Sequence, residues 1–166
     1  KYLKNLPKLS GASGEISITP LTFQAELQSG NIKSIPITKG YLQMTKDNFN
    51  IWNSELNFQG VGDNYTILEI LNHDPLNIVD KFGIKPYQVS GISLSKVKLE
   101  FPVRTDLNLN MIDFSISSRL EKFSVRDIYN NLSLSDAEMV LQASKKNLEN
   151  FGMGKLNNVN ANILWK

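Results

Sequence analysis

The sequence contains no cysteine and a single histidine, His73, among its 166 residues. The absence of cysteine excludes disulfides, thiolate metal sites and cysteine nucleophiles. One histidine excludes a metal site built from several imidazoles and leaves one candidate for any histidine-based triad. His73 lies in the segment Asn-His-Asp-Pro, a pattern typical of a joint between two helices, where a histidine caps a helix or faces solvent. The adjacent Asp74 does not supply the spatial arrangement that a catalytic triad requires.

A strong charge of either sign is also missing. The chain has 18 basic and 16 acidic residues, and its net charge is +2. Only three of the basic residues are arginines, the residue type best suited to binding phosphate groups through two parallel hydrogen bonds. The sequence therefore predicts no nucleic-acid partner.

No run of 18 apolar residues and no secretory signal peptide occurs. The chain begins at Lys1 rather than at a methionine, so we expect a segment excised from a longer protein. Neither absence, of an apolar run or of a signal peptide, places the parent protein, because an anchor could lie upstream of Lys1. The lack of cysteine is compatible with both the cytosol and the periplasm.

The motifs of common enzymes are absent. There is no Gly-x-Ser-x-Gly nucleophile elbow, no glycine-rich loop that binds phosphate, and no Asp-x-Asp-x-Asp-Gly calcium loop. The carboxylates are spread over polar strand positions, and no spacing singles out a pair for glycoside hydrolysis. We therefore predict that the chain is not an enzyme and binds no metal or cofactor.

The dominant pattern is alternation of apolar and polar residues, which is typical of strands with one buried face. It recurs along the chain, and each run predicts a strand: Ile16 and Ile18; Leu21 to Leu27; Ile35 and Ile37; Leu42 and Met44; Phe49 and Ile51; Leu56 and Phe58; Leu94 to Val103; Leu107, Leu109 and Met111; Phe114 and Ile116; Leu132 to Ala143; Val159 to Trp165. Near Lys96 and Val97 the alternation slips, which suggests a β-bulge.

Turn signals separate these runs, and one helical insert interrupts them. The predicted turns lie at residues 11–14, 29–31, 39–40, 46–48, 60–64, 130–131, 145–147 and 157–158. Residues 64–72 predict a helix of about two turns capped by Asp63 or Asn64, and residues 76–82 predict a second short helix. The insert is expected to cover an end or an edge of the sheet. We predict one mainly β domain over residues 1–166: a curled antiparallel sheet, groove-like or sandwich-like, with a short helical insert near residues 64–83.

Each predicted strand places its apolar side chains on one side, so the sheet needs a cover for one face. A second sheet, helices or an apolar ligand would each provide that cover. An ordinary sandwich core and a curled sheet that lines a lipid-sized groove both fit the pattern. Periodicity alone leaves these two alternatives open.

Several short motifs resemble a known family. Residues 72–86 read Asn-His-Asp-Pro-Leu-Asn-Ile-Val-Asp-Lys-Phe-Gly-Ile-Lys-Pro, and Val-Ser-Gly-Ile-Ser-Leu at 89–94 and Val-Lys-Leu-Glu-Phe-Pro-Val at 97–103 follow. This order resembles the AsmA-like proteins of the DUF3971 or YhdP type, with Val103 in place of the usual leucine. Residues 151–157 resemble the family's Gly-x-Gly-x-Leu-x-Gly strand, with Asn157 or Asn158 where glycine is common, and residues 163–165 fit its closing strand.

The resemblance implies a function. Such proteins are anchored in the bacterial inner membrane, extend into the periplasm, and are built from β-grooves lined with apolar side chains. They are implicated in moving phospholipids between the inner and outer membranes during outer membrane biogenesis. This chain would then be a periplasmic segment whose partner is phospholipid. From the alternation we predict that seven side chains face the lipid: Leu94, Leu99, Phe101, Leu107, Leu109, Met139 and Leu141.

A structural or interaction module is the alternative. A closed β-sandwich without a ligand would act as a spacer, and its exposed edge strands would favour self-association or binding of another strand.

Overall fold

The computed structural model describes residues 7–73 and 83–166. Nine strands account for most of them: β1 (Leu9–Ile18), β2 (Thr22–Ile32), β3 (Ile35–Lys46), β4 (Trp52–Asp63), β5 (Val89–Pro102), β6 (Asp113–Tyr129), β7 (Leu132–Ser144), β8 (Leu148–Leu156) and β9 (Val159–Trp165). One α-helix, α1 (Asn64–Leu71), follows β4. Two single turns of 3₁₀ helix, η2 (Pro86–Gln88) and η3 (Leu109–Met111), precede β5 and β6.

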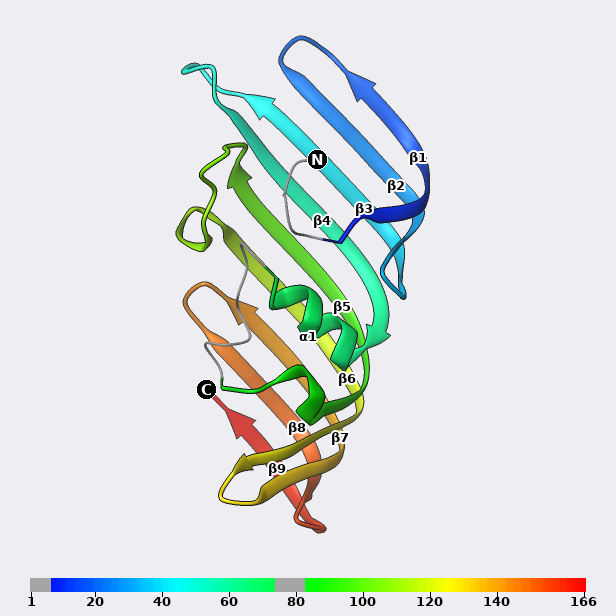
Figure 1. Ribbon diagram of the computed structural model, residues 1–166, viewed down its shortest axis with the longest axis vertical. Helices are drawn as coiled ribbons and strands as arrows, with labels where there is room; N and C mark the ends of the chain where they lie inside the picture. Colours follow the sequence, from blue (N-terminus) through cyan, green and yellow to red (C-terminus); the bar gives the residue numbers. More distant parts are fainter. Residues whose placement is uncertain (1–6, 74–82) are drawn as a thin grey trace.

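All nine strands form one sheet in chain order, and every neighbouring pair is antiparallel. Figure 1 shows a curled sheet that stays open, with α1 against one of its faces. The two edges are β1 and β9. The predicted mainly β fold, a curled antiparallel sheet with a short helical insert, is confirmed. It is a single sheet rather than two packed sheets.

The asparagine-rich turns are where the sequence places them. Asn130 and Asn131 join β6 to β7, and Asn157 and Asn158 join β8 to β9; all four have positive φ angles between 44° and 70°. Two consecutive residues of positive φ make the tight hairpin turn whose twist matches that of the flanking strands. Asparagine tolerates this conformation better than most residues do.

Four of the glycine-based turn predictions are wrong. Residues 11–14, 29–31 and 39–40 lie inside strands, and of residues 60–64 the first four end β4 while Asn64 begins α1. β2 turns into β3 at Lys33 and Ser34 instead. The reason is local crowding. A Cβ atom at Gly40 would lie 2.9 Å from Leu27 Cβ, and one at Gly62 would lie 2.7 Å from Ile35 Cγ1. Glycine is required at these positions by close packing within the sheet, not by a turn.

The bulges gather at one end of the sheet. Register shifts occur in β1 between Ser10 and Gly14, in β3 at Ile37–Lys39, in β5 at Ser90–Ile92, and in β6 and β7 after Leu120 and Ser135. No shift occurs near Lys96, so the predicted bulge there is wrong. Because a bulge bends its strand and increases the local twist, these shifts explain the curl at this end.

The helical insert is confirmed in its first part. The Asp63 side chain caps α1 by accepting a 2.8 Å hydrogen bond from the Thr66 amide. The second predicted helix, residues 76–82, lies outside the described residues.

The strand predicted over Leu107, Leu109 and Met111 is wrong. These residues lie in the β5–β6 connection, where the Asn108 side chain accepts a hydrogen bond from the Asn110 amide and starts η3.

Candidate functional site: the apolar face

The strand register places most of the apolar residues of β1 to β7 on one side of the sheet. Directly opposed residues in antiparallel strands share a face, and successive residues alternate. One row of opposed residues crosses β1 to β6: Ile16, Ala25, Leu42, Leu56, Leu99 and Phe114. A second row on the same side crosses β6 to β9: Leu120, Met139, Gly152 and Ile163. We call this side the apolar face.

The opposite side, here called the polar face, has a different chemistry. The matching row across β1 to β6 consists of Glu15, Glu26, Tyr41, Asn57, Lys98 and Ser115. Along this row, strands β1 to β6 have one polar side and one apolar side. A second row on the polar face crosses β6 to β9 and consists of Arg119, Val140, Phe151 and Leu164, so the polar face becomes more apolar toward β9.

Glycines on the apolar face mark it as the crowded, inner side of the curl. Gly40, Gly60, Gly62 and Gly154 all lie on it, and a Cβ atom at any of them would lie within 3.0 Å of a neighbouring atom. Side chains converge on the concave side of a bent sheet and diverge on its convex side. The missing side chains therefore let the strands curl toward the apolar face.

This crowding predicts a stability effect. Gly154→Ala is expected to destabilise the fold by about 1–3 kcal/mol, since its Cβ would meet Ala137 Cβ at 2.7 Å and Leu134 Cδ1 at 2.9 Å. The clash outweighs the smaller gain from a stiffer unfolded chain. Chemical denaturation measures the change. Met153→Ala, at the exposed neighbouring position on the polar face, is the control and is expected to shift stability by less than about 0.5 kcal/mol. Equal effects of the two substitutions would contradict the explanation.

Two clusters of buried side chains lie on the apolar face. In the first, Leu99, Phe101 and Ile112 are buried, and Leu71 of α1 packs against them together with Leu107 and Leu109. The second cluster lies on β6, β7 and their neighbours and is built on four buried residues: Leu120, Leu134, Ala137 and Met139. These clusters hold the curled sheet together.

The helix α1 is fixed to the apolar face by buried polar contacts. The Asn64 side chain donates to the Ser90 carbonyl oxygen at 3.2 Å and accepts a hydrogen bond from the Ser93 hydroxyl. Asn64 and Ser93 are both buried, so these bonds satisfy groups that would otherwise lose water without compensation. At the other side of the helix, Lys33 Nζ lies 3.0 Å from Glu69 Oε2 and joins α1 to the β2–β3 turn.

This ion pair predicts a pH dependence. Hydrogen bonds from Lys33 and Tyr65 hold the pKa of Glu69 below its ordinary value of 4.5. A lowered pKa stabilises the fold above the unfolded-state pKa, and the contribution is lost as pH falls through the folded-state value. Acidification from about pH 5 to about pH 3 is therefore expected to lower the melting temperature less in Glu69→Gln than in the unsubstituted chain. An identical loss in both proteins would show that the pair contributes nothing.

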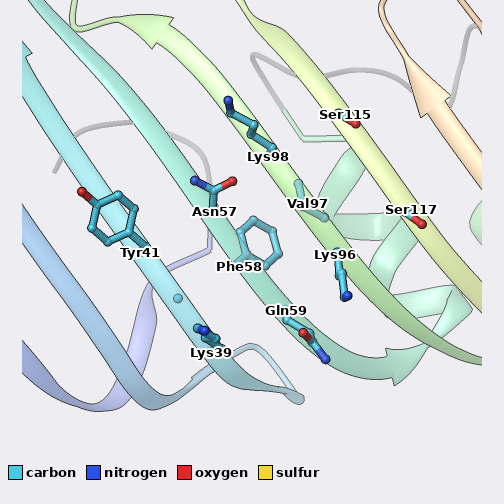
Figure 2. Close-up of a pocket in the computed structure, with 11 residues that line it drawn as sticks. Lys39, Tyr41, Asn57, Phe58, Gln59, Lys96, Val97, Lys98, Ser115 and Ser117 are labelled. Atoms are coloured by element: carbon cyan, nitrogen blue, oxygen red, sulfur yellow. The ribbon is translucent and has the colours of Figure 1, made fainter.

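The polar face carries a shallow hollow of about 280 Å³. Figure 2 shows its lining side chains, among them Tyr41, Asn57 and Lys98, projecting from the side of the sheet opposite the helix. Lys98 Nζ lies 3.2 Å from Glu100 Oε1 and 3.6 Å from Glu55 Oε1, and these carboxylates, Glu100 foremost, raise the pKa of Lys98. On this face Tyr41 donates a hydrogen bond to Gln43 Oε1, and Asn57 donates one to Glu55 Oε1, as expected of a solvated surface.

The seven predicted lipid-facing residues are not all on one face. Leu99 and Phe101 lie on the apolar face in β5, as do Met139 and Leu141 in β7. Leu107 and Leu109 lie in the β5–β6 connection but pack on the same side, against the first cluster.

Leu94 is the exception. It opposes Val61 and Arg119 on the polar face and is 39% exposed. Without a bulge near Lys96, five positions separate Leu94 from Leu99, and an odd separation in a regular strand reverses the face.

Four exposed positions of the apolar face were missing from that prediction. Ile16 and Ile18 on β1 are 67% and 71% exposed, and Val159 and Trp165 on β9 are also exposed, all on the apolar face. The signal for them was the same alternation that predicted the strands. Which strands form the edges, and so leave these side chains open, depends on the order of the strands in the sheet.

Two further searches of the structure concern metals and membranes. Within residues 7–73 and 83–166, no group of three or more histidine, aspartate or glutamate side chains is placed to hold a metal ion. Among the helices of the same described residues, none is both long and apolar enough to cross a membrane.

Comparison with known proteins found no matching family model, no matching curated protein and no matching solved structure. The contrast between the two faces of the sheet is therefore the feature that indicates a function.

Proposed function

We propose that the apolar face binds the acyl chains of phospholipids, and that the chain is a segment of a bridge along which phospholipids move between the inner and outer bacterial membranes. One observation carries the proposal. The apolar face continues through all nine strands and reaches both edges of the sheet, where Ile16, Ile18 and Val159 remain exposed. An ordinary core would be covered at these ends, because exposed apolar surface costs free energy.

The dimensions suit an acyl chain. Neighbouring strands lie about 4.8 Å apart, so nine strands give an apolar face roughly 38 Å wide across the strands. The hydrocarbon core of a bilayer is about 30 Å thick, so the acyl chains of one leaflet extend about 15 Å. A phospholipid lying across the strands would cover three or four of them, which leaves room for more than one lipid in a file.

The mechanism is physical rather than chemical. Each acyl methylene that leaves water for the apolar face is stabilised by about 0.8 kcal/mol. The headgroup stays in solvent along the open side of the curl. Where α1 does not cover the apolar face, its similar composition from strand to strand gives similar free energy at each step, so a lipid can slide there without a high-affinity site. The proposal assigns no catalytic residue, metal or cofactor.

The proposal includes the location of the segment in the cell and the membrane to which its parent protein is anchored. The motifs at residues 72–103 and 151–157 resemble AsmA-like proteins, which supports a periplasmic location and a parent protein anchored in the inner membrane by parts outside this chain. The polar face, with its mutually paired charges, would then contact the aqueous periplasm.

Native mass spectrometry of the purified chain, followed by extraction into organic solvent, tests the proposal. We expect co-purifying phospholipid at a defined stoichiometry. A lipid-free mass, together with no uptake of fluorescent phospholipid from vesicles, would reject it and favour the alternative of a scaffold or interaction module. That alternative is supported by the two unpaired edge strands, which suit strand addition.

A further inference from the structure

One end of the sheet presents exposed apolar side chains at its connections. These connections join β1 to β2, β3 to β4, β5 to β6 and β7 to β8, and the antiparallel order of the strands places them along the same end (Figure 1). The first three carry Leu21, Phe49 and Val103, which are 62%, 85% and 36% exposed. The hairpin turns at the opposite end consist of polar residues: Lys33-Ser34, Asn130-Asn131 and Asn157-Asn158.

Hydrogen bonds join the first three connections into one continuous rim. The Lys46 amide donates to the Leu21 carbonyl oxygen at 3.0 Å, and the Val103 amide donates to the Trp52 carbonyl oxygen at 2.7 Å. Neighbouring connections at one end of such a sheet are two strands apart, which is about 10 Å. Leu21, Phe49 and Val103 therefore form a row of apolar tips, here called the apolar rim.

The β3–β4 connection holds Phe49 in solvent through its own hydrogen bonds. Asp47 Oδ1 accepts bonds from the amides of Phe49 and Ile51, both at 2.9 Å, and Asp47 Oδ2 accepts one from the Asn53 side chain at 3.2 Å. The loop is thus built by Asp47, and the aromatic ring of Phe49 is not part of the core. Neighbouring exposed apolar side chains that the fold does not need indicate a contact with another molecule.

The acidic side chains at this end of the sheet are bound within the protein. Asp47 accepts the hydrogen bonds described above. Arg104 Nε lies 2.8 Å from Asp106 Oδ1, and Lys145 Nζ lies 3.5 Å from Asp113 Oδ1. These carboxylates are therefore neutralised locally and do not repel an anionic partner.

Two lysines beside the apolar rim are available to a partner. Lys46 ends β3, directly before the loop that carries Phe49, and Lys146 lies in the β7–β8 connection. Among the residues that the structure describes, neither lysine forms an ion pair. Cations next to apolar tips suit a surface that has anionic groups outside and an apolar interior, as a lipid bilayer has.

The shape of the apolar rim favours a bilayer over a protein partner. A protein that binds specifically needs a fitted contact surface of about 800 Å² on each partner. The apolar rim instead offers separate tips about 10 Å apart, each with one apolar side chain. Fluid lipid can surround each tip separately, so it needs no surface of matching shape.

We propose that the apolar rim docks on an anionic lipid bilayer, with Leu21, Phe49 and Val103 inserted among the lipids and Lys46 and Lys146 beside the phosphates. Apolar side chains that enter the bilayer leave water, and each cation near an anionic surface adds to the attraction. The argument for docking does not use the apolar face. Only one consequence rests on the proposed function: this segment would lie at a membrane end of the bridge rather than midway along it.

Flotation with vesicles of phosphatidylcholine and phosphatidylglycerol tests the docking. We expect the chain to float with these vesicles, and to float less with vesicles of phosphatidylcholine alone, which lack the anionic charge that attracts the two lysines. Phe49→Ser should weaken binding by about tenfold or more, because its aromatic ring no longer leaves water. Tyr129→Ser removes a 73% exposed aromatic ring at the opposite end of the sheet and should bind as the unsubstituted chain does. Equal losses in the two variants, or no flotation with either vesicle, would overturn the proposal.

A fluorescent label locates the docked surface directly, because the sequence contains no cysteine. Asn48→Cys places a label beside Phe49, and Ser34→Cys places one in the β2–β3 turn at the opposite end. A dye that brightens in apolar surroundings should respond to the anionic vesicles on the Asn48→Cys variant and not on the Ser34→Cys variant. An equal response at both positions, or a response only in the Ser34→Cys variant, would overturn the proposed orientation.

Docking and acyl-chain binding can fail separately. Phe49→Ser should still co-purify with phospholipid, because Phe49 lies in a connection and not on the apolar face. Flotation that depends on Phe49, without co-purifying phospholipid in either protein, would reject the lipid-transport proposal and leave the docking intact. Co-purifying phospholipid without flotation would reject the docking alone. Self-association that depends on Phe49, without vesicle binding, would assign the apolar rim to a protein contact and overturn the docking.

Discussion

Leu99→Asp is expected to unfold the protein. Leu99 is only 7% exposed and is enclosed by Phe101, Ile112 and the helix residue Leu71. A carboxylate there loses its water and finds no cationic partner in this apolar cluster. We expect a loss of about 4 kcal/mol or more in the free energy of unfolding, measured by urea denaturation.

The matched control lies in the same strand. Leu94→Asp introduces the same charge at a 39% exposed position on the polar face, opposite Arg119. Its effect on stability should stay within about 0.5 kcal/mol. If Leu99→Asp instead folds as stably as Leu94→Asp, then Leu99 is not core and the assignment of the two faces is wrong.

The double substitution Ile16→Asn and Ile18→Asn is expected to weaken phospholipid uptake without unfolding the chain. Both side chains are exposed on the apolar face at the β1 edge. Full burial of an isoleucine side chain contributes about 1.5–3 kcal/mol, so partial cover by an acyl chain at two such positions is worth at least about 1.4 kcal/mol. That difference corresponds to about a tenfold change in affinity. Titration with a fluorescent phospholipid measures it.

The control pair removes apolar side chains from the other face. Val61 and Leu94 oppose each other on the polar face and are 38% and 39% exposed. Val61→Asn with Leu94→Asn should leave uptake unchanged. A similar loss of uptake in both double variants would show that binding does not distinguish the faces.

Most of the strands, the asparagine turns and α1 could be predicted because their signals are local. The strand predicted at Phe49 and Ile51 is wrong, because these residues lie in the connection between β3 and β4. Alternation predicts a strand wherever one face is buried, and Asn157-Asn158 predicts a tight turn because asparagine tolerates positive φ. The cap of α1 needs only Asp63 and the amide of Thr66, three residues apart.

The remainder depends on contacts between strands. In the sequence alone, Gly62 is typical of a turn. In the structure a glycine is required at this position because Ile35 of the neighbouring strand occupies the space that a Cβ atom would take. The sequence pattern assigns Leu94 and Leu99 to the same face, but the regular strand register places Leu94 on the other face. Periodicity reports that one face is apolar, whereas the order of the strands decides whether that face is closed or open.

Photo-crosslinking can show whether acyl chains bind to the apolar face. The probe is a phospholipid that carries a diazirine on its acyl chain, and mass spectrometry locates the adducts. Adducts are expected on apolar-face residues of several strands, among them Ile16, Ile18, Leu42 and Phe58. Val61 and Leu94, two of the exposed apolar residues on the polar face, should remain unlabelled. Adducts distributed equally over the two faces, or confined to the polar face, would contradict a lipid-binding groove.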